Sequence, residues 1–183
     1  MKRLWTPWRM KYIKAPKEKS TGCVFCEKIK ATREHDRDNL VLFRGKHSFI
    51  ALNLYPYTNG HIMVIPYAHT GDFESLDGAT LKEMMLRVGE SMRALRLVAN
   101  PQGFNIGMNL GRVAGAGVEE HVHIHVVPRW NGDTDFMAVT ADVRKIPEML
   151  PETYDSLLAA MKTQTGASKA KRKQTATRRV KKD

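Results

Sequence analysis

The chain has 183 residues, of which 42% are hydrophobic, and its formal net charge is +11. This length suits one well-buried domain with tails, and the composition argues against a mostly disordered chain. No stretch of eighteen apolar residues is present, and the basic N-terminus lacks the apolar run of a secretory signal. We therefore expect a cytoplasmic protein without a membrane span.

The positive charge is concentrated at the C-terminus. Residues 166–183 contribute +7 of the +11 and contain no large apolar residue except Val180, which is typical of a disordered segment. No aromatic residues interleave these charges to stack on bases, so we expect weak attraction to RNA or other polyanions rather than a dedicated nucleic-acid-binding function. The predicted organisation is an N-terminal arm (1–22), one domain (23–165) and a disordered basic tail (166–183).

The first half of the domain is predicted to begin with a short helix and continue in strands. A helical turn is expected at Val24–Lys30, followed by strands at Leu40–Arg44, Ser48–Asn53 and His61–Pro66. Gly45-Lys46 between the first two strands is a turn signal.

A long amphipathic helix follows. Thr80-Leu-Lys-Glu83 fits a capping box, and Asn100-Pro101 ends the pattern. Between them, apolar residues recur at spacings of three, four and seven, which indicates one buried helix face. Its members are Leu81, Met84, Met85, Val88, Met92, Leu95 and Val98.

The second half returns to strands. Strands are expected at Phe104–Asn109 and His121–Val127, with the glycine-rich loop Gly111–Gly117 between them and a further strand candidate at Phe136–Val139. Pro151 opens a C-terminal helix whose buried side carries Tyr154, Leu157, Leu158 and Met161. The pattern predicts an α+β fold: an antiparallel sheet of about five strands, one long helix packed on it, and a C-terminal helix.

Three histidines alternate along the strand His121–Val127. Because side chains alternate across a strand, His121, His123 and His125 share one face while the intervening Val and Ile residues pack on the other. A purely structural row would need three sets of buried hydrogen-bond partners, which is costly. A metal-chelating row is an alternative and predicts further ligands nearby. Nucleophilic chemistry explains more, because neutral imidazole attacks phosphorus and a neighbouring imidazole can protonate the leaving oxygen.

The chain has two cysteines, Cys23 and Cys26, in a single C-x-x-C. This number excludes a disulfide framework, so the pair is either redox-active or half of a metal site.

The segment His-Val-His-Ile-His-Val-Val resembles the signature of the histidine-triad (HIT) superfamily. The resemblance extends upstream through Ala51–Asn53, Gly60–Pro66 and Asn109–Gly111 to Ala114-Gly115. Two further stretches, Leu4–Arg9 and Val127–Thr134, are similar to the bacterial branch that includes diadenosine tetraphosphate phosphorylases. The resemblance implies a HIT-like fold and a hydrolase or nucleotidyltransferase acting on dinucleoside polyphosphates such as diadenosine tetraphosphate.

The resemblance also implies residue roles. His123 would be the nucleophile that takes the nucleoside monophosphate, and His125 would contact the phosphate and protonate the leaving group. Asn109 would hold the phosphate or the attacking imidazole, Asn53 would bind the ribose hydroxyls, and Trp130 would border the nucleotide pocket.

One position departs from the family pattern. Many relatives carry Ser or Thr four residues before the first His, where the hydroxyl contacts phosphate. This chain has Gly117 there and lacks that hydroxyl, although backbone N–H groups of the loop can surround phosphate. Hydrolysis and phosphorolysis both remain open. Alternative functions are a nucleoside phosphoramidate or aminoacyl-adenylate hydrolase and a non-catalytic nucleotide-binding protein.

In zinc-bearing HIT proteins, two histidines complete the metal site: one shortly after the Ile-Pro segment and the first histidine of the triad. The corresponding set here is Cys23, Cys26, His69 and His121, which would hold a structural zinc. His61, in the glycine-histidine part of the signature, would be a structural hydrogen-bonding residue. The resemblance further implies a homodimer and is compatible with magnesium bound together with the nucleotide substrate.

Overall fold

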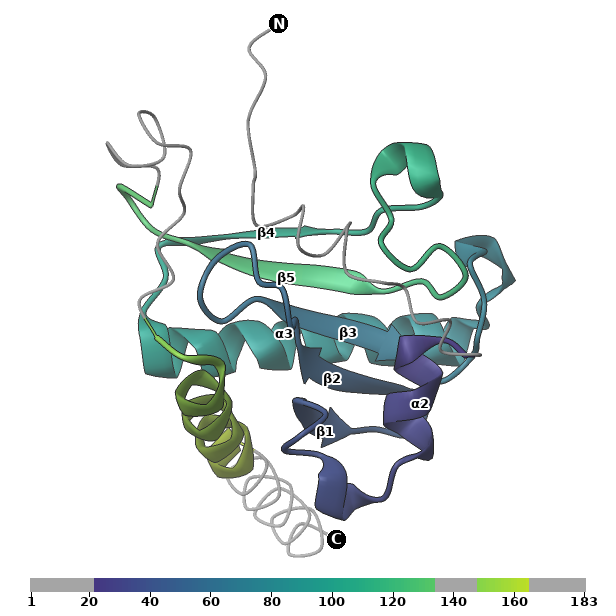
Figure 1. The fold of residues 1–183 in the computed structure, drawn as a ribbon. Helices are drawn as coiled ribbons and strands as arrows, with labels where there is room; N and C mark the ends of the chain where they lie inside the picture. The colour runs from purple at the N-terminus through teal and green to yellow at the C-terminus, as the bar shows by residue number, and fades with distance from the viewer. Residues whose placement is uncertain (1–21, 134–147, 165–183) are drawn as a thin grey trace, which may run out of the picture.

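The structure, a computed structural model, describes residues 22–133 and 148–164. Five strands of this part form one antiparallel sheet in the order β1-β2-β3-β5-β4, so β5 is inserted between β3 and β4 (Figure 1). The α+β class and the five-stranded sheet predicted from the sequence are therefore confirmed. The elements in chain order are α2 (Val24–Lys30), η1 (Arg33–His35), β1 (Val41–Arg44), β2 (Ser48–Leu52), β3 (Ile62–Pro66), η2 (Phe73–Ser75), α3 (Gly78–Ala99), β4 (Gly103–Gly107), η3 (Arg112–Ala114), β5 (Ile124–Arg129) and a helix over 150–164.

The long helix α3 covers one face of the sheet, behind β2, β3 and β5 in Figure 1. Its side chains Met84, Val88 and Leu95 are buried against that face, and burial of a side chain of this size contributes about 1.5–3 kcal/mol. Two members of the predicted stripe are exposed, Met85 at 60% and Val98 at 41%, and Leu81 and Met92 are partly buried. The buried face is therefore narrower than the apolar pattern suggested.

The start of α3 corrects the predicted capping box. Asp77 is the N-cap, and its carboxylate accepts a hydrogen bond from the backbone N–H of Thr80 at 2.7 Å. Glu83 instead accepts hydrogen bonds from the backbone N–H groups of His47 and Ser48, both at 3.2 Å. The carboxylate of Asp77 displaces Thr80 as the cap because an ionised oxygen is the stronger acceptor for the free N–H groups of the first turn. Glu83 thereby ties the helix to the β1–β2 turn.

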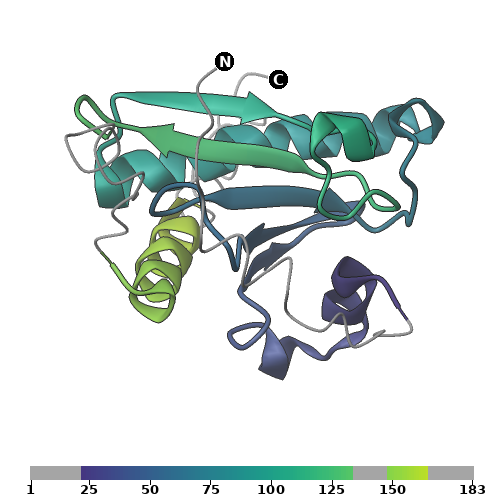
Figure 2. The same cartoon turned by 45° about the horizontal axis from the view of Figure 1, so that its top comes forward.

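The opposite face of the sheet carries α2 and a second, smaller core. This core consists of Cys23, Phe25, Val41, Phe49, Ala51, Met63 and Ile65. The helix over 150–164 packs with the α3-side core, where Tyr154 and Leu157 are buried as predicted and the Tyr154 hydroxyl donates to the Val41 carbonyl at 2.9 Å. Figures 1 and 2 show α2 and this C-terminal helix at opposite ends of the sheet.

Some predictions lie outside the described residues. These are the arm up to residue 21, the strand candidate Phe136–Val139 and the basic tail from residue 166. Among the helices that the structure describes, none combines the length and apolar character needed to cross a membrane.

Candidate active site and metal centre

The histidine row lies where the sequence pattern predicts it. Val122, Ile124 and Val126 point into the α3-side core. By the alternation of the strand, His121, His123 and His125 therefore project from the opposite face. Pairing with β3 begins only at Ile124, because the N–H of Val122 is used by the carbonyl of Thr70 at 2.8 Å. The first two histidines thus precede the regular strand and the third lies within it.

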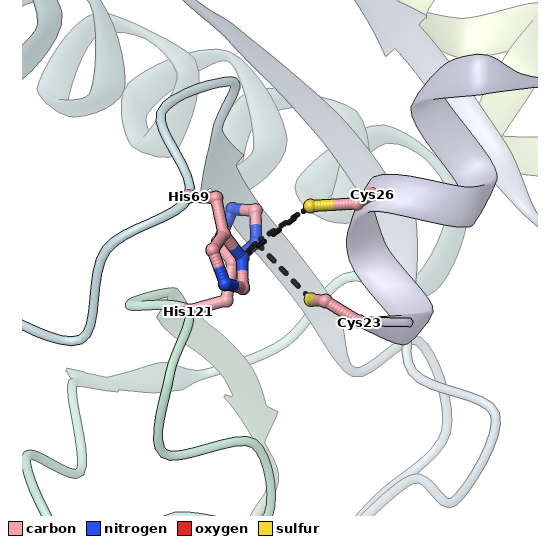
Figure 3. A group of neighbouring side chains, drawn as sticks. All are labelled: Cys23, Cys26, His69 and His121. Atoms are coloured by element: carbon pink, nitrogen blue, oxygen red, sulfur yellow. Dashed lines mark hydrogen bonds between the residues drawn. The ribbon is translucent and has the colours of Figure 1, made fainter. Parts of the chain in front are cut away.

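Four side chains converge at the end of this row. Figure 3 shows Cys23 and Cys26 pointing from the first turn of α2 toward His69 and His121. Their donor atoms all lie within 4.8 Å of one another. The Nδ1 atom of His121 is 3.3 Å from the sulfur of Cys23, 3.7 Å from that of Cys26 and 3.4 Å from Nδ1 of His69, which is itself 3.4 Å from the sulfur of Cys26.

These distances fit a tetrahedral zinc ion. With Zn–S bonds of about 2.3 Å and Zn–N bonds of about 2.0–2.1 Å, the S···N edges of the tetrahedron are about 3.5 Å and the N···N edge is about 3.4 Å. The Nε2 atom of His121 lies 2.9 Å from the carbonyl oxygen of Pro66, which accepts its proton and leaves Nδ1 as the free lone pair. The orientation of His121 is therefore the one a metal ligand needs, and its reactive nitrogen faces the cysteines.

His123 is held differently. Its Nδ1 atom lies 2.9 Å from the carbonyl oxygen of His121, so Nδ1 carries the proton and Nε2 has the free lone pair. The side chain is buried, with 6% exposure. Burial lowers the pKa of His123 below the ordinary value of 6.5, although the hydrogen bond to the His121 carbonyl acts in the opposite direction. At neutral pH this residue is a neutral imidazole with an available nitrogen.

His125 is oriented by a chain of hydrogen bonds. The backbone N–H of Tyr57 donates to Nδ1 of His61 at 3.2 Å, and the side-chain amide of Asn53 lies 3.3 Å from the same atom. Because this nitrogen accepts, the proton of His61 resides on Nε2, which lies 3.0 Å from Nδ1 of His125. His125 must therefore accept at Nδ1 and carry its own proton on Nε2.

Both members of this chain are neutral at physiological pH. Burial lowers the pKa of His61 to about 3, with further contributions from His125 and His123. Burial, followed by the neighbouring His123, lowers the pKa of His125 to about 4. The rings of His123 and His125 have their centroids 4.7 Å apart. The site thus presents the Nε2 lone pair of His123 beside the Nε2–H of His125.

A cavity of about 820 Å³ lies beside His125. Asn109 and Trp130, both predicted from the resemblance, line it together with Tyr57 and Arg129. The indole N–H of Trp130 donates to the Ala99 carbonyl at 3.0 Å, which fixes the ring in place. The Asn109 amide lies 3.4 Å from the carbonyl of Gly115 and so contacts the glycine-rich loop.

Three other predicted residues, His123, Asn53 and Gly117, do not line this cavity. Asn53 contacts the site through His61, and Gly117 is exposed in the loop before the histidine row. Sequence reasoning did not identify the contact of His61 with His125, the Tyr57 N–H that orients it, or the ring of Phe25, whose centroid is 4.9 Å from that of His123. The register of β3 against β5, with Met63 opposite His125, places His61 beside the row. An antiparallel pairing of the two predicted strands is the signal that could have found it.

The fold and the histidine row define a histidine-triad protein. A zinc-bound histidine triad family protein from Mycobacterium smegmatis superimposes with a TM-score of 0.63 and 31% identity, over 81% of this chain and 99% of that one. A hypothetical histidine triad nucleotide-binding protein from Sulfolobus tokodaii gives a TM-score of 0.61 and 25% identity, over 77% and 93% of the two chains.

Sequence comparison agrees with the structural similarity. The family model of the HIT domain matches residues 34–132. A protein of Mycobacterium tuberculosis named AP-4-A phosphorylase is 39% identical over 157 residues, which cover 84% of this chain and 80% of that protein. The chain belongs to the HIT family.

Proposed function

We propose that this protein is a nucleotide hydrolase or phosphorylase that cleaves dinucleoside polyphosphates, such as diadenosine tetraphosphate, through a nucleotidyl intermediate on His123. The observation that carries the proposal is a pair of hydrogen bonds that give two neighbouring neutral imidazoles opposite tautomers. His123 is held at Nδ1, which leaves a lone pair on its Nε2, and His125 accepts at Nδ1, which leaves a proton on its Nε2. The mycobacterial relative named AP-4-A phosphorylase supports the choice of substrate class.

The reaction proceeds in two balanced steps. In the first, Nε2 of His123 forms a bond to the α-phosphorus while the P–O bond to the leaving nucleotide breaks, and the leaving oxygen departs as an anion that accepts a hydrogen bond from Nε2–H of His125. In the second step water or phosphate attacks the same phosphorus and its surplus proton passes to solvent, while His125 keeps its proton on Nε2. The new P–O bond forms as the P–N bond breaks, and both histidines end in their starting protonation states.

The remaining predicted residues have supporting roles in this scheme. Asn109 and the backbone of the loop at Gly117 hold the phosphate, Asn53 binds the ribose, and Trp130 forms a wall of the nucleotide pocket. Polar groups that are already fixed in place stabilise developing charge without reorganisation. The tight hydrogen bond of the Trp130 indole to the backbone supports such a fixed wall. Magnesium would arrive with the substrate polyphosphate and requires no protein ligand in this scheme.

Zinc would be held by Cys23, Cys26, His69 and His121 in a structural role. The donor distances support this assignment, and when bound the ion cross-links α2 to the segment that precedes β5. No step of the proposed reaction passes through it.

We further propose that the protein is a homodimer. In the described part of the chain, β4 pairs only with β5 and leaves its outer edge free, and Ile106 on it is 45% exposed. Leu97 on α3 is also exposed, at 66%. Open strand edges with exposed apolar residues favour pairing with another chain. Light scattering should give twice the chain mass of 20.8 kDa, and a monomer at micromolar concentration would contradict the proposal.

The deciding experiment is turnover of diadenosine tetraphosphate with and without inorganic phosphate. ADP plus ATP identifies phosphorolysis, and AMP plus ATP identifies asymmetric hydrolysis. His123→Ala should lower kcat at least ~10³-fold, because both steps pass through its nitrogen, and His125→Ala should lower it about 10²-fold. His35→Ala, an exposed histidine outside the site, serves as the matched control.

Two outcomes would overturn the proposal. Activity of His123→Ala equal to that of the wild type would exclude the covalent mechanism. Absence of any product with the wild type would favour a nucleoside phosphoramidate or aminoacyl-adenylate hydrolase, to be tested on those substrates, or a nucleotide-binding protein without catalysis.

A further inference from the structure

The short helix α2 contacts both the metal centre and the histidine row. Cys23 precedes its first residue and Cys26 lies in its first turn, and Phe25 stands between them. The Phe25 side chain is 4% exposed. Its ring lies edge-on to His121 at a centroid distance of 5.4 Å and tilted against His123 at 4.9 Å. One residue of this helix therefore contacts a metal ligand and the proposed nucleophile at once.

The helix has little stability of its own. It contains seven residues, and the side chain of its N-cap, Cys23, makes no hydrogen bond to the N–H groups of the first turn. A helix of this length is marginal in isolation, because nucleation costs more than so few hydrogen bonds return. Its position must therefore come from tertiary contacts, which are the packing of Phe25 in the second core and the polar groups that hold its two ends.

The C-terminal end is held by Arg44. Its guanidinium donates to the carbonyl oxygens of Ile29 at 2.9 Å, Lys28 at 2.9 Å and Ala31 at 3.0 Å, and it pairs with Asp36 at 2.7 Å. These contacts need no metal. At the N-terminal end, where Phe25 lies, the cysteine–histidine group contributes polar anchorage.

His123 depends on neighbouring rings for its orientation. A single hydrogen bond, from Nδ1 to the His121 carbonyl, holds the ring, and rotation about the side-chain torsions of His123 would break it. The ring is flanked by His125 at 4.7 Å and by Phe25 at 4.9 Å. Close packing on both sides restricts the imidazole to one rotamer and so directs Nε2.

We propose that Phe25 is a positioning residue for His123, and that the metal centre supports catalysis by holding Phe25 against this ring. The proposal rests on the proposed function of His123 as nucleophile. Loss of metal would release the first turn of α2 while Arg44 keeps its last turn in place. Phe25 would then withdraw from the imidazole, and the population of correctly oriented Nε2 would fall. Substrate contacts would be unchanged, so kcat should fall while KM stays constant.

The test compares metal-loaded and metal-depleted full-length protein in two variants and one control. Phe25→Ala removes the ring, and Phe25→Leu keeps most of its apolar volume. Phe49→Leu is the matched control, because Phe49 is 1% exposed in the same core but stacks on Tyr67 instead of a histidine. Metal is removed with a chelator at a temperature at which circular dichroism shows a folded chain.

We expect Phe25→Ala to lower kcat between about tenfold and about a hundredfold, with KM changed less than about twofold and zinc still present at one ion per chain. Phe25→Leu should lie between Phe25→Ala and wild type, and Phe49→Leu should match wild type. Depletion of metal should lower the kcat of wild type by a similar factor but have little further effect on Phe25→Ala, because the two changes remove the same restraint.

A second readout requires no substrate. The imidazole ¹⁵N shifts of His123 at pH 8 should report one tautomer in the wild type, with the proton on Nδ1, and a mixture in Phe25→Ala and in metal-depleted protein. If Phe25→Ala does not fold, Phe25→Leu decides the question by the same measurements.

Three results would overturn the proposal. These are equal losses in Phe25 and Phe49 variants, a full additional loss on metal depletion of Phe25→Ala, or unchanged His123 shifts in both. If His123→Ala is inactive and the Phe25 variants behave as wild type, the positioning role fails while the proposed function stands. An active His123→Ala would instead remove the proposed function.

Discussion

His61 should control activity through the protonation of His125, although it does not line the cavity. The residue is fully buried, and its Nε2 atom lies 3.0 Å from Nδ1 of His125. Replacement by leucine removes this donor. The Nδ1 atom of His125 then has no partner in the protein, and the ring can place its proton there instead of on Nε2, where the leaving oxygen needs it.

The size of the effect follows from the hydrogen bond that is lost. A buried polar group left without its partner costs about 1–3 kcal/mol, which corresponds to a decrease in kcat of about fivefold to about 150-fold for His61→Leu. His61→Gln is the matched control, since its amide nitrogen can reach the position of Nε2 and donate to His125. It should retain activity within about threefold of wild type.

The assay should compare two leaving groups in single-turnover experiments. The phenyl ester of AMP releases a basic phenolate whose oxygen benefits from a proton donor, whereas the p-nitrophenyl ester of AMP releases a much weaker base that needs none. His61→Leu should slow the first reaction by the factor given above and the second much less. Equal losses with both substrates would show that His61 is merely structural, and no loss with either would refute the tautomer argument.

Three further predictions concern stability, pH and the tail. Cys26→Ser should abolish the stoichiometric zinc and lower Tm, as measured by metal analysis and thermal melts; freshly purified wild type without zinc would contradict this. The pKa of His61 is lowered to about 3, so between that value and about 6.5 the unfolded chain binds more protons. The free energy of unfolding should therefore fall as pH drops below 6.5, by at most about 1.4 kcal/mol per pH unit for this group, and denaturant titrations should show a weaker dependence in His61→Gln. Deletion of residues 167–183, which carry +7 of the charge, should preserve turnover at physiological salt and weaken salt-sensitive polyanion binding, unless the tail contributes to the active site.

The local features of this protein were predictable because they depend on short-range periodicity. Alternation along residues 121–127 placed three histidines on one face, and the spacing of apolar residues identified α3. The predicted metal group rested on resemblance, and its four side chains do converge. The first two inferences need only the residue types and the geometry of a single element, whereas the metal group needed the resemblance because its ligands come from three separate segments.

The contacts that orient the site were not predictable in this way. His61 meets His125 across a separation of 64 residues, and this contact depends on the register between β3 and β5. Phe25 lies against His123 because α2 folds back over the sheet, which no local pattern indicates. The predicted capping box of α3 was wrong for a related reason. Glu83 accepts hydrogen bonds from the β1–β2 turn, which is far away in the sequence.

The three histidines of the row are equivalent in sequence and become different through the second partner of each ring. His121 uses Nε2 for the Pro66 carbonyl and presents Nδ1 to the cysteines. His123 uses Nδ1 for the carbonyl of His121, two residues earlier, and keeps the lone pair of Nε2 free. His125 accepts at Nδ1 and therefore has an N–H to donate at Nε2. Under the proposed mechanism, metal ligand, nucleophile and hydrogen-bond donor are thus assigned by which nitrogen the protein already occupies. It follows that variants that change the hydrogen-bond partner of each ring should separate the three roles more cleanly than variants of the histidines themselves.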